Sequence, residues 1–168
     1  MAAQYRMPIK RSPKADPQQY RVYRMENEAI GARRHMRLKP SAIEKLVRSV
    51  CRNYGVKPPK VRWKYLGKWA AEWDNDRINL NPSKGTSRDI LTVTHELAHH
   101  IHYCISLGKS EEQQPHGPQF MACHISILDT CRIIPVVGMR AICKKWKVAF
   151  CDPGESNSLA TLRRIARR

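Results

Sequence analysis

The chain has 168 residues, 42% of them hydrophobic, and its 31 Lys and Arg against 14 Asp and Glu give a net charge of +17. This length allows one hydrophobic core of roughly 100 residues with extensions, and we do not expect two full domains. The sequence has no apolar run of about eighteen residues and no apolar stretch at its start, which argues against a membrane span and a secretory signal and predicts a cytoplasmic or nucleoid-associated protein.

Residues 1–38 are predicted to form a basic N-terminal arm. Residues 1–40 carry ten Lys and Arg against three acids, and charge of this density favours contact with nucleic acid. The residues expected to make this contact are Arg6, Lys10, Arg11, Arg33 and Arg34. The tyrosines of the arm either stack on bases or, as the commoner arrangement, pack the arm onto its own domain. Residues 18–34 could form a helix on binding a partner.

Residues 39–133 are predicted as the folded core, and a helix opens it. The helix is expected to begin at Ser41, whose hydroxyl would form a capping box with Glu44. Apolar residues follow at helical spacing. Gly55 stands where a C-terminal cap is expected.

Three strand-like segments come next, separated by turn signals. They are residues 61–66, 69–73 and 77–80. Their short connections predict an antiparallel meander. The tryptophans of these segments, Trp63, Trp69 and Trp73, are interpreted as packing residues rather than a ligand-stacking set. Asn79 and Asn81 are either positions where a substrate backbone adds to the edge of the sheet or solvent-facing polar positions.

The motif His-Glu-Leu-Ala-His follows, in a predicted amphipathic helix that Thr86 or Ser87 would cap. With about 3.6 residues per turn, His95 and His99 stand one turn apart on the same face, where two imidazoles can hold one metal ion. Glu96 lies beside them, placed to accept a proton rather than to bind the metal. The motif therefore indicates a metal-dependent hydrolytic site.

A third candidate ligand, His116, lies immediately before Gly117 and Pro118. Proline is favoured at the first position of a helix, so residues 117–131 are predicted as a second helix with His116 at its start. A catalytic zinc takes three protein ligands and keeps one position open. His116 is positioned to complete such a set.

The combination of His-Glu-x-x-His with a downstream His-Gly-Pro-x-Phe resembles the SprT-like zinc metallopeptidase family. The resemblance covers about residues 41–131. Within it, Trp63, Gly67 and residues 77–81 look like the small sheet of that family, whose edge strand borders the cleft.

The resemblance implies a zincin-like α+β fold, with a small antiparallel sheet packed on an active-site helix and flanking helices. It also implies that Zn²⁺ is held by His95, His99 and His116. Glu96 would be the general base and a polypeptide the substrate. Many members act on proteins attached to DNA, which favours DNA over RNA as the partner.

Residues 134–168 are predicted as a basic helical C-terminal extension. The expected nucleic-acid contacts in this extension are Arg163, Arg164, Arg167 and Arg168. Because the basic ends lie away from the metal motifs, removing residues 1–38 or these arginines is expected to leave zinc content unchanged.

The remaining histidines and cysteines have simpler interpretations. His100 and His102 turn away from the metal-binding face of their helix. His124 is either an ordinary helical histidine or a partner of a ligand. A second zinc site built from Cys123, His124, Cys131 or Cys143 is a minor alternative. The six cysteines have irregular spacings that suit thiols in a reducing compartment.

Two functions compete. The leading hypothesis is a zinc-dependent endopeptidase that acts on proteins associated with DNA or RNA. The alternative is a non-catalytic zincin-fold protein that binds nucleic acid or serves as a structural component of a nucleoprotein assembly, such as a phage particle. The presence of Glu96 favours the enzyme, since a structural zinc site does not need an adjacent carboxylate.

Overall fold

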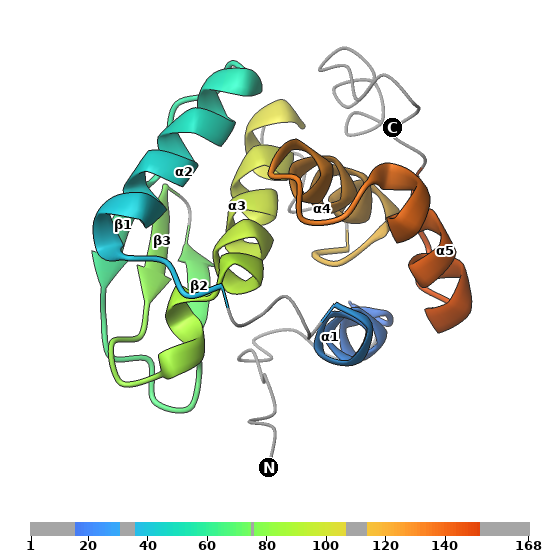
Figure 1. The fold of residues 1–168 in the computed structure, drawn as a ribbon, viewed down its shortest axis with the longest axis horizontal. Helices are drawn as coiled ribbons and strands as arrows, with labels where there is room; N and C mark the ends of the chain where they lie inside the picture. The colour runs from blue at the N-terminus through green and yellow to red at the C-terminus, as the bar shows by residue number, and fades with distance from the viewer. Residues whose placement is uncertain (1–15, 31–35, 75, 107–113, 152–168) are drawn as a thin grey trace.

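The computed structural model describes residues 16–30, 36–74, 76–106 and 114–151, which form an α+β fold (Figure 1). The helices are α1 (Gln19–Ala29), α2 (Pro40–Asn53), α3 (Ile90–Ile105), α4 (Pro118–Thr130) and α5 (Val136–Trp146). A short 3-10 turn, η2 (Gly85–Arg88), precedes α3. The strands are β1 (Lys60–Trp63), β2 (Ala71–Asp74) and β3 (Arg77–Leu80). The predicted α+β class is confirmed.

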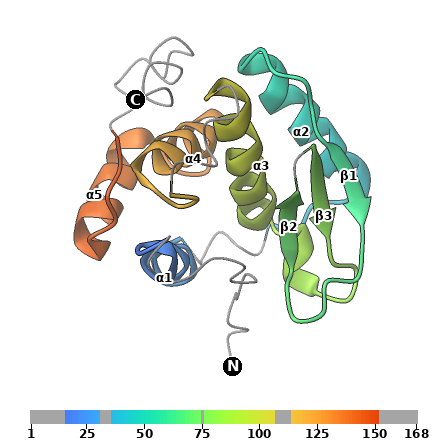
Figure 2. The ribbon, with the colours of Figure 1, turned by 180° about the vertical axis from the view of Figure 1, so that it is seen from behind.

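The sheet is mixed, with the strand order β1-β3-β2. β2 pairs with β3 antiparallel, but β1 pairs with β3 in parallel, so the predicted antiparallel meander is wrong in one of its two pairings. Only two residues separate β2 from β3, and so short a connection allows only antiparallel pairing of these strands. β3 takes the centre because Ile78, Asn79 and Leu80 are buried, whereas the largely exposed β1 takes an edge (Figure 2).

Two helices do not have the N-terminal caps that the sequence predicted. α2 begins at Pro40, whose fixed backbone angle suits the first helical position, and the capping box of Ser41 and Glu44 does not form. The Glu44 carboxylate lies 3.5 Å from the Arg48 guanidinium instead. The end of α2 is as predicted, because Gly55 has a φ of 61° just beyond it.

The start of α3 is also corrected. Thr86 and Ser87 belong to η2, so neither caps α3. The residue before the helix is Asp89, which makes no side-chain cap to α3. The Asp89 carboxylate lies 3.9 Å from Arg37. The helix therefore begins at Ile90.

α3 is the central element of the fold, with α4 on one side and β2 on the other (Figures 1 and 2). α1 packs against α5 and contributes Val22 and Met25 to the main hydrophobic core, to which Ile30, just after the helix, also belongs. The helix that the sequence allowed within residues 18–34 thus forms within the chain's own core. Among the described residues, none of the helices combines the length and the apolar character that crossing a membrane requires.

Candidate metal centre

α3 supplies two of the three converging imidazoles. His95 and His99 are four residues apart, and their ring centroids lie 5.0 Å from each other on one face of the helix. His95 has 1% of its surface exposed, while His99 is only partly buried. Glu96, the next residue after His95, is fully buried. The pair is therefore fixed inside the protein and open to solvent on the His99 side.

The start of α4 brings in the third imidazole. His116 lies just before Gly117 and Pro118, and its ring centroid is 5.2 Å from that of His95 and 4.9 Å from that of His99. Each of these histidines offers a nitrogen within 4.8 Å of the others. The structure thus brings together the three residues that the sequence singled out as metal ligands.

Aromatic side chains hold the three imidazoles from two directions. Phe120, from the first turn of α4, lies with its ring centroid 4.3 Å from His99, 5.0 Å from His116 and 5.2 Å from His95. Trp73 of β2 stacks on His99 at 6.3 Å, with 19° between the rings. Because both contacts limit rotation of the imidazoles, the ligand geometry is largely set before any metal binds.

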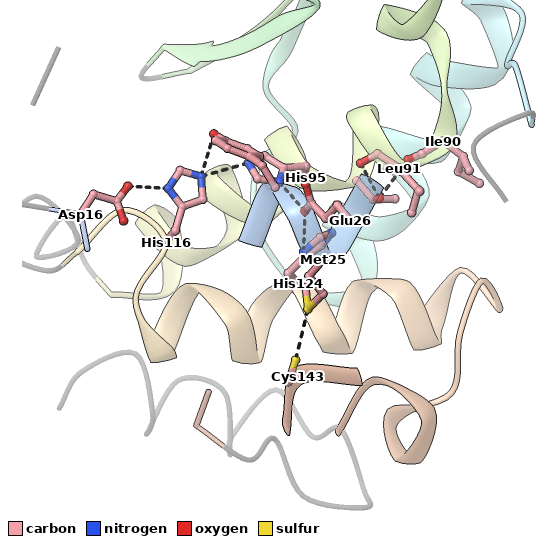
Figure 3. Close-up of polar contacts among 11 residues, drawn as sticks. Asp16, Met25, Glu26, Ile90, Leu91, His95, His116, His124 and Cys143 are labelled. Atoms are coloured by element: carbon pink, nitrogen blue, oxygen red, sulfur yellow. Dashed lines mark hydrogen bonds and ion pairs between the residues drawn. The ribbon is translucent and has the colours of Figure 1, made fainter. Parts of the chain in front are cut away.

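Two carboxylates from the N-terminal segment orient two of the ligands, and sequence reasoning missed both. The Nδ1 atom of His95 donates to Glu26 Oε1 over 2.7 Å, and Nδ1 of His116 donates to Asp16 Oδ2 over 2.6 Å (Figure 3). A carboxylate on one imidazole nitrogen fixes the tautomer and leaves the other nitrogen with a free lone pair. Both histidines are thereby prepared to bind a metal through Nε2.

The Nε2 atoms of His95 and His116 face each other at 3.2 Å. With both Nδ1 atoms donating to carboxylates, two lone pairs meet across this gap, and a cation between them would relieve the repulsion. Two nitrogens on a tetrahedral zinc, each about 2.0–2.1 Å from the ion, lie roughly 3.3 Å apart. The observed spacing matches a shared tetrahedral ion.

The pKa shifts of the histidines agree with this arrangement. Burial, with the neighbouring imidazoles adding to it, holds the pKa of His99 well below its ordinary value. Burial also lowers the pKa of His116, although the Asp16 hydrogen bond opposes it. Burial alone would lower the pKa of His95, but nearby carboxylates, Glu26 foremost, outweigh it and raise the value. The Glu26 carboxylate therefore favours positive charge at His95, which a metal ion would also supply.

Tyr23 of α1 is a further residue of the site. Its Oη atom lies 3.1 Å from Nε2 of His116, and its ring contacts those of His116 and His95. Burial, together with the charges of Glu96 and Glu26, holds the pKa of this phenol well above its ordinary value. Of the two roles considered from sequence for the arm's tyrosines, Tyr23 takes the packing role, because it is 7% exposed.

The contacts of the N-terminal segment change the expected effect of deleting residues 1–38 on zinc content. Removing residues 1–38 would also remove Asp16, Tyr23 and Glu26, all of which contact the candidate ligands. Such a deletion is therefore not a neutral test of nucleic-acid binding. Point substitutions in the basic residues are needed instead.

His100 and His124, outside the three-histidine cluster, have different partners. His100 accepts from Trp73 Nε1 at 3.4 Å through Nδ1 and donates to the Lys57 carbonyl at 2.8 Å, so it connects α3 with β2 and with the segment before β1. His124 is fully buried, and its Nδ1 lies 3.4 Å from Glu26, the partner of His95. Burial lowers the pKa of His124 to about 4.

The suggested Cys-containing second zinc site finds no support. The cysteines of the candidate set, Cys123, Cys131 and Cys143, are free thiols. In the described part of the chain, the groups that could hold a metal ion consist of histidines and Glu26, with no cysteine. Burial raises the pKa of the Cys123 thiol to about 12, which disfavours the thiolate that a metal ligand requires.

The expectation of substrate pairing at Asn79 and Asn81 is corrected. Both side chains are buried, and β3 is the central strand, so neither position lies at an edge or faces solvent. Asn81 instead donates to the Gly67 and Trp69 carbonyls and holds the loop before β2. The edge strand beside α3 is β2.

The predicted nucleic-acid contacts fall outside the described residues. These are Arg6, Lys10, Arg11, Arg33, Arg34, Arg163, Arg164, Arg167 and Arg168. In the described part of the chain, an exposed basic segment occurs on and just after β1. It carries Lys60, Arg62 and Lys64 together with exposed Trp63 and Tyr65.

The candidate metal centre is assembled from three segments that are far apart in the sequence. Two sequence motifs on α3 and α4 meet in one buried cluster, and α1 completes it. A scan of protein-family models and searches of curated proteins and of solved structures found no match to the chain.

Proposed function

We propose that this protein is a zinc-dependent endopeptidase of SprT-like, zincin type that acts on proteins associated with DNA or RNA. The observation that carries the proposal is the convergence of His95, His99 and His116 with Glu96 on the same helix. Three imidazoles and an open position are the ligand set of catalytic zinc, whereas structural zinc sites are usually closed by four protein ligands.

The residues around the cluster have separate roles in this proposal. His95, His99 and His116 would hold Zn²⁺, which when bound supplies Lewis-acid polarisation of a carbonyl and makes a nearby water more acidic. Glu96 accepts the proton of the attacking water. Burial raises the pKa of Tyr23 and the Glu96 charge adds to that rise; at His95 burial opposes the rise in pKa, Glu26 is its main cause, and Glu96 adds to it. Glu26 and Asp16 keep two ligands in the required tautomer.

A polypeptide substrate is favoured by the surroundings of His99. This ligand is the partly exposed one, so a substrate would approach the centre from its side. The edge strand β2 lies beside α3 there, and its Trp73 stacks on His99. An extended peptide can add to such an edge through backbone hydrogen bonds, which accept many sequences.

The first experiment measures metal and its effect on stability. Natively purified protein should contain one zinc per chain, and chelation should abolish proteolysis of a basic DNA-binding protein. A site filled at about 1,000 times its dissociation constant adds roughly 4 kcal/mol, so chelation should lower Tm by roughly 10 °C and zinc should restore it. Protein without zinc, or with a Tm indifferent to chelation, would contradict the proposed centre.

Nucleic acid is proposed as the partner that brings substrates to the enzyme. The net charge of +17 supports it, as does the exposed segment of residues 62–65, in which basic and aromatic side chains alternate. Basic side chains can meet phosphates there while aromatic rings stack on bases. Proximity on the nucleic acid would then select the substrate.

Salt dependence tests this partner. Affinity for duplex DNA should fall steeply with salt, with a log-log slope of roughly −0.9 for each phosphate neutralised. Changing Arg163, Arg164, Arg167 and Arg168 to Ala, or Arg62 and Lys64 to Ala, should flatten the slope and leave zinc content unchanged. Arg48→Ala, at an exposed position paired with Glu44, is the matched control. Unchanged slopes in both sets would assign those residues to solubility or to a protein partner.

One observation favours a non-catalytic alternative, in which the zincin-type fold is a rigid platform in a nucleoprotein assembly. Glu96, His95 and His116 are at most 2% exposed, as in centres that serve only to stabilise a fold. Substitution of Glu96 separates the two functions.

A further inference from the structure

We infer that Tyr23 is a catalytic residue whose hydroxyl donates a hydrogen bond to the oxyanion that forms when the carbonyl of a bound peptide is attacked. This inference rests on the proposed function, because it assigns a further role in the same reaction. The sequence named no residue for oxyanion stabilisation. The structure supplies Tyr23 from α1, far from both metal motifs in the sequence.

The position of the hydroxyl is the first observation. Tyr23 Oη lies 3.1 Å from His116 Nε2, the nitrogen that also faces His95 Nε2 at 3.2 Å. The hydroxyl therefore lies beside the ligand nitrogens, inside the buried part of the cluster. A donor is most effective in a buried pocket, where water does not compete for the acceptor.

The direction of donation follows from the tautomer of His116. Because Nδ1 of His116 donates to Asp16, its Nε2 carries a lone pair, and the Tyr23 hydroxyl donates to it. Once that lone pair holds a metal ion, the hydroxyl hydrogen can turn to another acceptor in the pocket. A peptide carbonyl oxygen that develops negative charge is the acceptor that hydrolysis would bring there. An ordinary phenol is neutral at pH 7, so donation needs no special titration.

The packing of α1 keeps the hydroxyl in place. Tyr23 and Glu26 are three residues apart and share one face of α1. Glu26 is bound to His95, so the same helix face is attached to the ligands at two points. The neighbouring apolar residues Val22 and Met25 are fully buried. The hydroxyl is therefore preorganised, as oxyanion donors must be.

The reaction balances with Tyr23 keeping its proton. Water attacks the carbonyl carbon, Glu96 takes one proton from it, and the electron pair of the C=O π bond moves onto the carbonyl oxygen. Tyr23 donates a hydrogen bond to that oxygen. The electron pair then returns, the C–N bond breaks, and the amide nitrogen leaves as an amine with the proton that Glu96 held. The products are a carboxylic acid and an amine, and Glu96 is ready again.

The test is Tyr23→Phe, which keeps the ring and its packing and removes only the hydroxyl. Loss of one oxyanion donor should lower kcat by about 10²–10³-fold with KM nearly unchanged. Zinc content and Tm should equal those of the wild type. Tyr20→Phe is the matched control, since Tyr20 lies on the same helix but is 70% exposed.

A second readout does not require peptide cleavage. In protein loaded with Co²⁺, the visible spectrum reports binding of acetohydroxamate, whose anionic oxygen would accept from Tyr23. Tyr23→Phe should weaken that binding by about ten- to hundredfold, the usual effect of a hydrogen bond to a charged group. This loss without any proteolysis in wild type would leave Tyr23 as the donor and reject the endopeptidase function.

Two results would overturn the inference. Unchanged kcat and unchanged acetohydroxamate affinity in Tyr23→Phe would show that the hydroxyl does not meet the oxyanion. Loss of zinc or a lowered Tm in this variant would show that the hydroxyl only positions His116.

Discussion

Glu96→Gln should lower the rate of proteolysis by about 10²–10⁴-fold, the usual contribution of a general base. An amide of the same shape cannot take the proton of the attacking water. Gln should occupy the same buried space, because it differs from Glu by one atom type. One zinc per chain and full affinity for DNA should remain, since neither depends on the Glu96 carboxylate.

The measurement is cleavage of a basic DNA-binding protein, with and without DNA, beside zinc analysis of each preparation. Glu44→Gln is the control, because Glu44 is an exposed carboxylate on α2. A Glu96→Gln variant with full activity would move the general base elsewhere. Wild type and variant that are equally inert on every substrate would favour the non-catalytic platform.

The ligand pair on α3 could be predicted from the sequence because it depends on a local rule. Residues four apart on a helix share a face whatever surrounds them, so His95 and His99 had to be neighbours. His116 could be predicted only through its motif, since the fold determines how a residue 21 positions away returns to the pair. Its place before Gly117 and Pro118 gave the start of α4 correctly.

The carboxylate partners could not be predicted by such rules. Glu26 is 69 residues from His95, and Asp16 is 100 residues from His116. The high positive charge of residues 1–40 predicts contact with nucleic acid and does not indicate that the acids among them orient metal ligands. A signal was present, because Glu26 stands next to the apolar Met25 on a helix whose inner face is buried. A carboxylate beside such a face needs a partner inside the protein.

The sheet shows the same division between local and long-range information. Only two residues separate β2 from β3, so their antiparallel pairing follows from local sequence. The partner of β1 depends on which strand is the most buried, and that is decided by the fold as a whole rather than by neighbouring residues. The prediction for Asn79 and Asn81 was wrong for this reason. Their polar side chains suggested an edge position, but both are buried, Asn79 in the central strand β3 and Asn81 just after it.

Glu26→Gln and Asp16→Asn should each weaken zinc binding by about 10- to 100-fold. Each carboxylate raises the basicity of its histidine and fixes Nδ1 as the donor. The amides can still accept the hydrogen bond, but they no longer favour positive charge on the ring. Since the two residues contact different imidazoles, the double variant should bind zinc about 10²–10⁴-fold more weakly if the effects add.

Competition with a zinc indicator at fixed pH measures these affinities, and circular dichroism with Tm checks the fold. Glu28→Gln is the matched control for Glu26, because it lies on α1 only two residues away, half exposed and paired with Arg24. Its zinc affinity should equal that of the wild type. Equal affinities in all three single variants would mean that α1 serves only to pack the core. A loss confined to Glu26→Gln and Asp16→Asn would establish that the N-terminal segment, basic as it is overall, contributes its acids to the metal centre.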